Sequence, residues 1–218
     1  MYVNNPCAYC GKTKYSREKG HVIPQCMFPD DTEPRIQRPT VPECSECKKL
    51  WQKEENQFRN ILVLAGDDPN SARREKWNGQ IKRSFHKPSG HVWIKDLKDQ
   101  MVPIKTENGN RHVIYPAKDP KVMVVIKKII RGLCHYHKIE ASISENRVWA
   151  DVLKYRIPSA LFKDMKSFDL GIKLLQYGYK VTMNNDPEIN SYWYFKFYEK
   201  VEFIGIVFKK ELNPTQEG

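Results

Sequence analysis

Four cysteines near the start of the chain form two pairs with the spacing of metal ligands. The stretch CAYC contains Cys7 and Cys10, and CSEC contains Cys44 and Cys47. Two such pairs separated by a loop are typical of a tetrahedral Zn²⁺ site, and four thiolates leave the ion no open position. Two disulfides or a thioredoxin-like pair are the alternatives, but neither CxxC follows a strand in a βαβ pattern. We therefore expect one structural zinc ion.

A histidine between the two pairs is the candidate catalytic residue. His21 lies in the stretch EKGHVIPQC. A neutral imidazole takes a proton from water near neutral pH, so a histidine facing a phosphate can serve as a general base. The alternative interpretation is a polar ring that is hydrogen-bonded within the zinc module and has no chemical role.

The remaining cysteines and a histidine pair are weaker candidates. We interpret Cys26 and Cys134 as buried thiols without a ligand role. The stretch CHYH places His135 and His137 two residues apart, so on a helix their side chains face away from each other. A core or surface role is therefore favoured over metal binding for both histidines.

The charge of the chain favours a polyanionic partner. The 37 Lys and Arg residues exceed the 26 Asp and Glu residues, which gives a net charge of +11 and points to nucleic acid. The composition, with 40% hydrophobic residues, is that of a soluble globular protein. No apolar run approaches the roughly 20 residues of a membrane span, and the N-terminus lacks a secretory pattern, so we expect a cytoplasmic protein without a membrane segment.

A zinc module over residues 1–65 would position the candidate residues. A cysteine knuckle is followed by an extended piece that ends near His21, and then by a loop rich in Pro and Asp. After the second pair, apolar residues recur at helical spacing and predict a helix. These apolar residues are Leu50, Trp51, Phe58, Ile61 and Leu62.

Residues 66–218 read as an α+β body of unknown role, either separate or sharing one core with the zinc module. We expect helices over 71–85, 121–139 and 147–155, a strand over 90–97, and a hairpin within 101–116 at the Asn108-Gly109 pair. A second hairpin is expected over 192–208. On the first of these helices, four basic residues could follow a phosphate backbone, although a solvated basic face explains them almost as well. They are Arg73, Arg74, Lys82 and Arg83.

Taken in order, CAYCG, GHVIP, VPECSEC and EENQFRN resemble the HNH endonuclease family over roughly the first third of the chain. That family has a ββα-metal fold, a treble clef with a structural zinc. The resemblance implies that His21 activates water for hydrolysis of DNA. It also implies a catalytic Mg²⁺ or Mn²⁺, held by an acid just before the histidine and by a His or Asn after the second CxxC.

The expected cation ligands are replaced in this chain. Gly20 stands where the acid is expected, and Lys48 stands where the His or Asn is expected. Glu55 lies seven residues after Lys48 on the same helical face and is one candidate replacement, with a solvated helix face as the alternative. Glu18 is the other candidate, since Gly20 leaves the adjacent backbone flexible.

Three functional hypotheses follow from these patterns. The first is a metal-dependent HNH-type nuclease acting on DNA. The second is a zinc-containing module that binds nucleic acid or protein but cuts nothing, in which Lys48 supplies positive charge directly and repels a divalent ion. The third is a component that docks a protein partner through residues 90–218.

Overall fold

The computed structural model is of mixed α and β structure with antiparallel sheets, as expected for an α+β protein. It describes residues 5–13, 17–28, 38–65, 79, 83, 95, 98–99, 101–106, 109–113, 119–155, 162–171, 173–182 and 186–212. Among these residues, no helix is long and apolar enough to cross a membrane.

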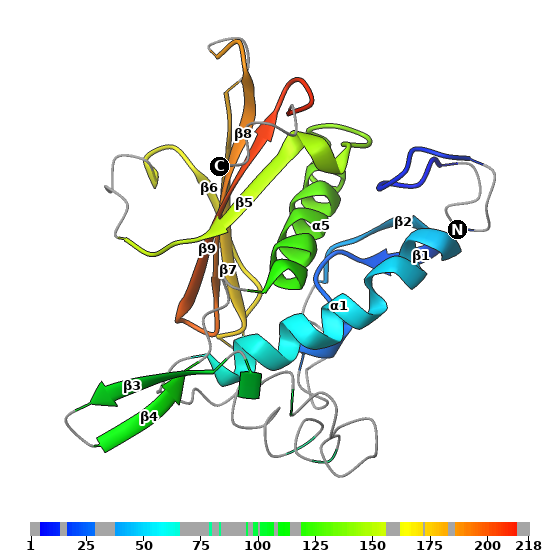
Figure 1. Cartoon of the computed structure of the whole chain (residues 1–218). Coiled ribbons are helices and arrows are strands. Elements are labelled where there is room, and N and C mark those ends of the chain that lie inside the picture. Colours follow the sequence, from blue (N-terminus) through cyan, green and yellow to red (C-terminus); the bar gives the residue numbers. More distant parts are fainter. Residues whose placement is uncertain are drawn as a thin grey trace.

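A hairpin and a helix follow one another in the N-terminal segment (Figure 1). Strands β1 (Arg17–His21) and β2 (Thr40–Cys44) are antiparallel, and His21 is paired with Thr40. Helix α1 (Ser45–Leu64) begins directly after β2, and the Cys44 sulfur caps it by accepting a hydrogen bond from the backbone N–H of Cys47. The second CxxC pair therefore lies across the junction between strand and helix.

Helix α1 confirms the predicted apolar face with one exception. Trp51, Phe58 and Ile61 are buried, but Leu50 is 64% exposed. Successive residues on a helix lie about 100° apart, so a helix that turns Trp51 inward turns Leu50 toward solvent.

Helix α5 (Pro120–Tyr136) lies between the N-terminal segment and the large sheet (Figure 1). Asp119 caps its first turn, and Pro120 occupies the first turn, where no backbone donor is needed. Its predicted apolar residues are all fully buried. They are Val122, Val125, Ile126, Ile129, Ile130 and Leu133.

A five-stranded antiparallel sheet forms the C-terminal part, in the order β5-β9-β8-β7-β6. Its central hairpin confirms the prediction for 192–208. The turn between its strands places Tyr198 and Glu199 at φ of 50° and 60°. The strands of this sheet are β5 (Val148–Val152), β6 (Lys166–Asp169), β7 (Leu175–Val181), β8 (Ile189–Phe197) and β9 (Val201–Phe208).

The helix predicted over 147–155 is wrong. A short 3-10 turn, η4 (Glu145–Arg147), leads directly into β5, which pairs with β9. Val148 and Ala150 are buried on one face while Trp149 lies on the other, which is a two-residue period. The available edge of β9 offers a hydrogen-bonding partner that the local sequence does not reveal.

The hairpin predicted within 101–116 is confirmed. Strands β3 (Val102–Thr106) and β4 (Gly109–Val113) are antiparallel, and Thr106 is paired with Gly109 at a φ of +105°. The helix predicted over 71–85 and the strand predicted over 90–97 lie mostly outside the described residues.

One cluster of buried side chains connects the N-terminal segment, α5 and the sheet. The Phe58 ring of α1 contacts Phe197 and Phe203 of the sheet, with centroids 5.4 and 6.3 Å apart. Close packing also depends on Gly132 of α5, where an added Cβ would lie 2.8 Å from Val22 Cγ1 and 2.9 Å from the Tyr9 hydroxyl. The helix is therefore seated directly on the N-terminal segment.

Candidate metal centre and histidine site

The four predicted zinc ligands come together. The sulfurs of Cys7, Cys10, Cys44 and Cys47 all lie within 4.8 Å of one another. The knuckle supplies the first two, the end of β2 supplies the third and the first turn of α1 supplies the fourth. Four sulfurs at these separations could hold a metal ion such as zinc, which would join the knuckle to the hairpin and the helix.

Hydrogen bonds within the cluster favour thiolate formation at one position. The Cys47 thiol and then several backbone amides lower the pKa of Cys7 to about 4. The same sharing raises the pKa of Cys47, and burial raises that of Cys10. A bound divalent ion would replace these shared protons and stabilise all four thiolates together.

His21 ends β1 in a setting that keeps its ring neutral. Burial lowers the pKa of His21 below 6.5, and the nearby charges of Arg38, Lys19, Lys128 and Lys48 lower it further. The ring is half-buried, and its Nδ1 has no hydrogen-bond partner among the described residues. A neutral imidazole surrounded by cations is suited to a negatively charged ligand.

Glu43 of β2 occupies the space that a side chain at position 20 would need. A Cβ added to Gly20 would lie 2.5 Å from the Cβ of Glu43 and 2.9 Å from its Cδ. The Glu43 side chain is buried, and its Oε1 has no hydrogen-bond partner among the described residues. Burial raises the pKa of Glu43 to about 7.

The sequence gives no motif signal for Glu43. It reads as one acid within VPECSEC, and only the register of the hairpin brings it beside Gly20. Had the strand pairing been known, the alternation of side chains would have placed Glu43 and Gly20 on the same face.

The two predicted cation ligands both form ion pairs with lysines. Glu18 pairs with Lys48, and both side chains are more than half exposed. Glu18 also lies opposite Glu43 in the hairpin register. Because exposed pairs contribute little stability, a competing ligand could separate Glu18 from Lys48 at small cost.

The second ion pair is buried and connects three elements. The Lys128 side chain is 2% exposed, and its ammonium donates to the Glu55 carboxylate of α1 and to the His21 backbone carbonyl at 3.1 Å. The same ammonium lies over the Tyr9 ring, 5.6 Å from its centroid. Glu55 therefore serves as the counterion of a buried lysine, and α5 contributes directly to the surroundings of His21.

The predicted basic helix face cannot be placed. Arg73, Arg74 and Lys82 lie outside the described residues, and Arg83 is exposed.

The minor candidates have structural contacts instead of metal partners. The His135 Nδ1 lies 2.6 Å from the Ala141 carbonyl, and the His137 Nε2 lies 3.0 Å from the Tyr177 hydroxyl. Within the described part of the chain, the four cysteines form the only group of three or more potential metal ligands.

The prediction that both remaining cysteines are buried is confirmed for Cys134 and wrong for Cys26. Cys134 is fully buried, and burial raises its pKa. Cys26 is half-buried and donates to the Glu55 carbonyl at 3.6 Å.

Comparisons with protein-family models, curated proteins and solved structures find no match to this chain.

Proposed function

We propose that this chain is an HNH-type nuclease. In this proposal its N-terminal segment is a treble-clef, ββα-metal module, its four cysteines hold a structural Zn²⁺, and His21 is the general base in the hydrolysis of DNA phosphodiester bonds. The observation that carries the proposal is the setting of His21: a half-buried ring whose pKa is lowered by burial and by the charges of four cationic side chains. This combination suits a phosphate and an attacking water.

The chain's own residues account for proton transfer and charge stabilisation. The neutral His21 imidazole accepts a proton as water forms a bond to phosphorus and the ester bond on the opposite side breaks. Arg38 and Lys19 are the cations beside His21 that would stabilise charge on the phosphate oxygens. The displaced oxygen leaves with a proton from solvent.

Only some of the carboxylates near His21 are suitable ligands for a divalent cation. Glu55 does not fit, because it is the counterion of the buried Lys128. Glu43 fits, since its buried Oε1 lacks a partner among the described residues, and Glu18 lies opposite it across the hairpin. These two residues would hold Mg²⁺ or Mn²⁺, which would act as a Lewis acid toward the phosphate.

Cleavage of supercoiled plasmid tests the proposal. We expect nicking by the wild-type protein with Mg²⁺ or Mn²⁺, and a loss of roughly 100-fold or more in His21→Ala, the range for removal of a general base. His135→Ala is the matched control, because this histidine ring contacts the Ala141 carbonyl at 2.6 Å. Equal nicking by the wild type and His21→Ala, or no nicking by any variant, would contradict the proposal.

A non-cleaving nucleic-acid-binding module is the second candidate function. Both predicted cation ligands are paired with lysines, and the described residues contain no second group of three metal ligands. In this alternative, the exposed Lys48 supplies positive charge where a nuclease would use a divalent ion. The cationic surroundings of His21 would then hold a phosphate without cutting it.

Titration calorimetry of zinc-loaded protein with Mn²⁺ distinguishes the two candidates. A nuclease should bind one further ion, and Glu43→Gln should remove that binding. A non-cleaving module should bind no second ion yet keep an affinity for DNA that falls with rising salt. Affinity that is independent of salt would exclude phosphate contacts in both candidates.

A further inference from the structure

A pocket with exposed aromatic rings lies where α5 ends. Its volume is about 380 Å³, and the described residues that line it come from the segment before β2, the end of α5, β6 and the two residues after it, and β7. They are Pro39, Tyr136, Phe168, Asp169, Leu170, Gly171 and Tyr177.

Two rings in this pocket are unusually accessible for their size. Tyr136 is 40% exposed and Phe168 is 37% exposed. Phe168 stacks on Tyr177 with centroids 5.0 Å apart and planes at 12°, and its centroid lies 4.7 Å from that of the His137 ring. The rings are held in place by these neighbours and offer a fixed surface for a flat ligand.

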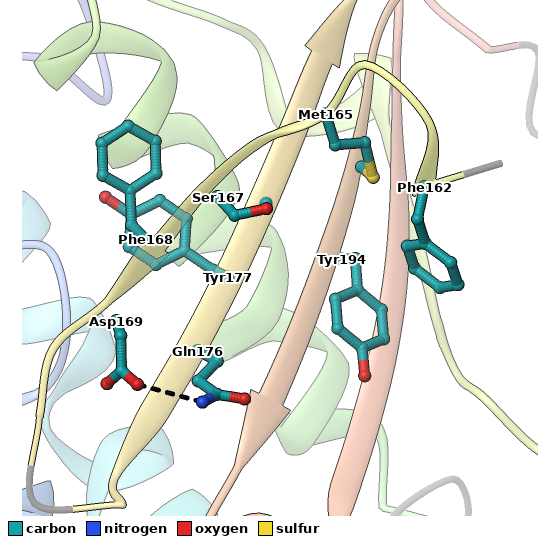
Figure 2. Close-up of a pocket in the computed structure, with 9 residues that line it drawn as sticks. Phe162, Met165, Ser167, Phe168, Asp169, Gln176, Tyr177 and Tyr194 are labelled. Carbon is teal, nitrogen blue, oxygen red and sulfur yellow. Dashed lines mark hydrogen bonds between the residues drawn. The ribbon is translucent and has the colours of Figure 1, made fainter. Parts of the chain in front are cut away.

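Figure 2 shows the neighbouring hollow on β6 and β7, which shares Phe168, Asp169 and Tyr177 with this pocket. Phe168 and Tyr177 lie side by side, and the Asp169 carboxylate points toward Gln176. The Asp169 side chain accepts hydrogen bonds from the Gln176 amide at 3.0 Å and from the Gly171 N–H at 2.7 Å. Asp169 is paired with Gln176 and Phe168 with Tyr177, so the Asp169 carboxylate and the Phe168 ring lie on opposite faces of the sheet.

Direct contacts connect the pocket to the His21 site. Pro39 lines the pocket, and its carbonyl accepts from the Val22 N–H at 3.0 Å, one residue beyond His21. Thr40 is the strand partner of His21, and Arg38, a cation beside His21, precedes Pro39. The aromatic pocket and the cationic site thus share one short segment.

The charges favour the phosphate of a nucleotide at His21 and its base in the aromatic pocket. A carboxylate at the edge of the pocket disfavours a phosphate there, whereas the exposed rings of Tyr136 and Phe168 offer an apolar surface to a base. The cations around His21 attract phosphate. An aromatic surface beside a cationic groove is the arrangement with which proteins bind single-stranded nucleic acid.

We propose that this pocket holds one unpaired nucleobase of the nucleic acid whose phosphate lies beside His21. The base stacks on the exposed rings of Tyr136 and Phe168. The inference rests on the proposed function in one respect: it requires nucleic acid at His21, whether or not it is cleaved. Single-stranded DNA, single-stranded RNA and a base displaced from a duplex would all supply this chemistry.

Fluorescence anisotropy on the full chain tests the pocket. The probes are a fluorescein-labelled 12-mer as single-stranded DNA, as RNA and as duplex DNA, together with an abasic 12-mer of the same backbone. We expect Tyr136→Ala and Phe168→Ala each to weaken binding of the preferred single strand roughly fivefold or more, the range for loss of a base stack. Tyr136→Phe, which keeps the ring, should bind like the wild type.

Salt dependence and the abasic probe separate stacking from phosphate contact. Tyr136→Ala should leave the slope of log affinity against log salt unchanged, whereas Arg38→Ala should reduce it by roughly 0.7 for a single strand. The abasic 12-mer should bind the wild type more weakly and be insensitive to Tyr136→Ala. Tyr155→Ala is the matched control, because this ring is 84% exposed and follows β5 at the opposite edge of the sheet.

The outcomes separate the pocket from the proposed function. Unchanged affinity in Tyr136→Ala and Phe168→Ala, or equal binding of normal and abasic strands, would overturn the base pocket and leave phosphate binding at His21 intact. Absence of binding to every probe by the wild type would overturn both. Preference among the DNA, RNA and duplex probes identifies the source of the base.

Discussion

At the scale of single residues, Glu43 of β2 places a carboxylate beside Gly20 of β1. The acid expected before His21 is absent from the sequence, but the neighbouring strand places Glu43 over the glycine, in space that any side chain at position 20 would fill. The Glu43 side chain can therefore take this position only because residue 20 is a glycine. Any substitution at Gly20 would displace the Glu43 side chain.

The pH dependence of His21 is a prediction at the scale of this residue. Because its pKa lies below 6.5, the ring stays neutral at pH 7, and the rate of nicking should fall only as the pH drops through that lower pKa. Arg38→Gln removes a neighbouring cation and should move the acid limb to higher pH. An NMR titration of His21 provides the measurement independently of activity, and a pKa at or above 6.5 would contradict the structure.

Glu43 should lower stability at alkaline pH. Its pKa rises from 4.5 to about 7 on folding, so the folded state binds more protons between these values and stability falls as the pH rises through them. Glu43→Gln should be more stable than the wild type at pH 8 by about 1–3 kcal/mol, and nearly equal to it at pH 4. Urea unfolding of zinc-loaded protein at both pH values checks this; parallel pH dependence in the two proteins would contradict it.

Helix α5 is the element that joins the two parts of the chain. One side packs on Val22 and Tyr9 at Gly132, and another packs on the sheet through its buried aliphatic residues. It also delivers Lys128 to the carbonyl of His21. The position of the histidine therefore depends on a helix more than 100 residues away in sequence.

The buried ion pair of α5 gives a prediction about this element. Lys128→Met leaves the Glu55 carboxylate partly buried without its partner and should lower the free energy of unfolding by about 3 kcal/mol. Glu55→Gln in the same chain should recover much of that loss, because no uncompensated charge remains. A double-mutant cycle by chemical denaturation measures this coupling, and strictly additive losses would show that the pair is not coupled.

The contact at Gly132 gives a prediction of definite sign. An alanine at an unconstrained helix position raises stability by up to about 1 kcal/mol. Here the added Cβ would lie 2.8 Å from Val22 Cγ1, so Gly132→Ala should lower stability by about 1–3 kcal/mol instead. A thermal melt decides the matter, and a raised melting temperature would contradict the close approach of α5 to the N-terminal segment.

At the scale of the whole molecule, the cysteine cluster should support more than the knuckle. The cluster joins the knuckle to β2 and α1, and α1 shares a buried core with α5 and the sheet. Loss of the ion should therefore reduce the stability of the whole chain. The same reasoning explains why the cysteine cluster could be predicted from local spacing while the packing of α1 on α5 and the sheet could not.

Metal analysis tests this expectation directly. Purified protein should contain one Zn²⁺ per chain, and Cys44→Ser should lose the ion and melt at a lower temperature. Cys26→Ser is the matched control, because this half-buried thiol lies outside the cluster and donates to the Glu55 carbonyl. Equal zinc content in both variants would contradict the assignment of the ligands.

The sequence by itself determined the features whose signals are local. The CxxC spacing predicted the cysteine cluster, apolar periodicity predicted α1 and α5, and alternation predicted the hairpin of β8 and β9. Only the tertiary structure decided the rest, because it depends on partners distant in the chain. Strand β9 turned the stretch after Arg147 into a strand, the register of β1 and β2 brought Glu43 to Gly20, and α5 made Glu55 the counterion of Lys128. The edge of a strand and a buried charge each pair with residues that are far away in the sequence. A pattern within one segment therefore cannot predict which residues these are.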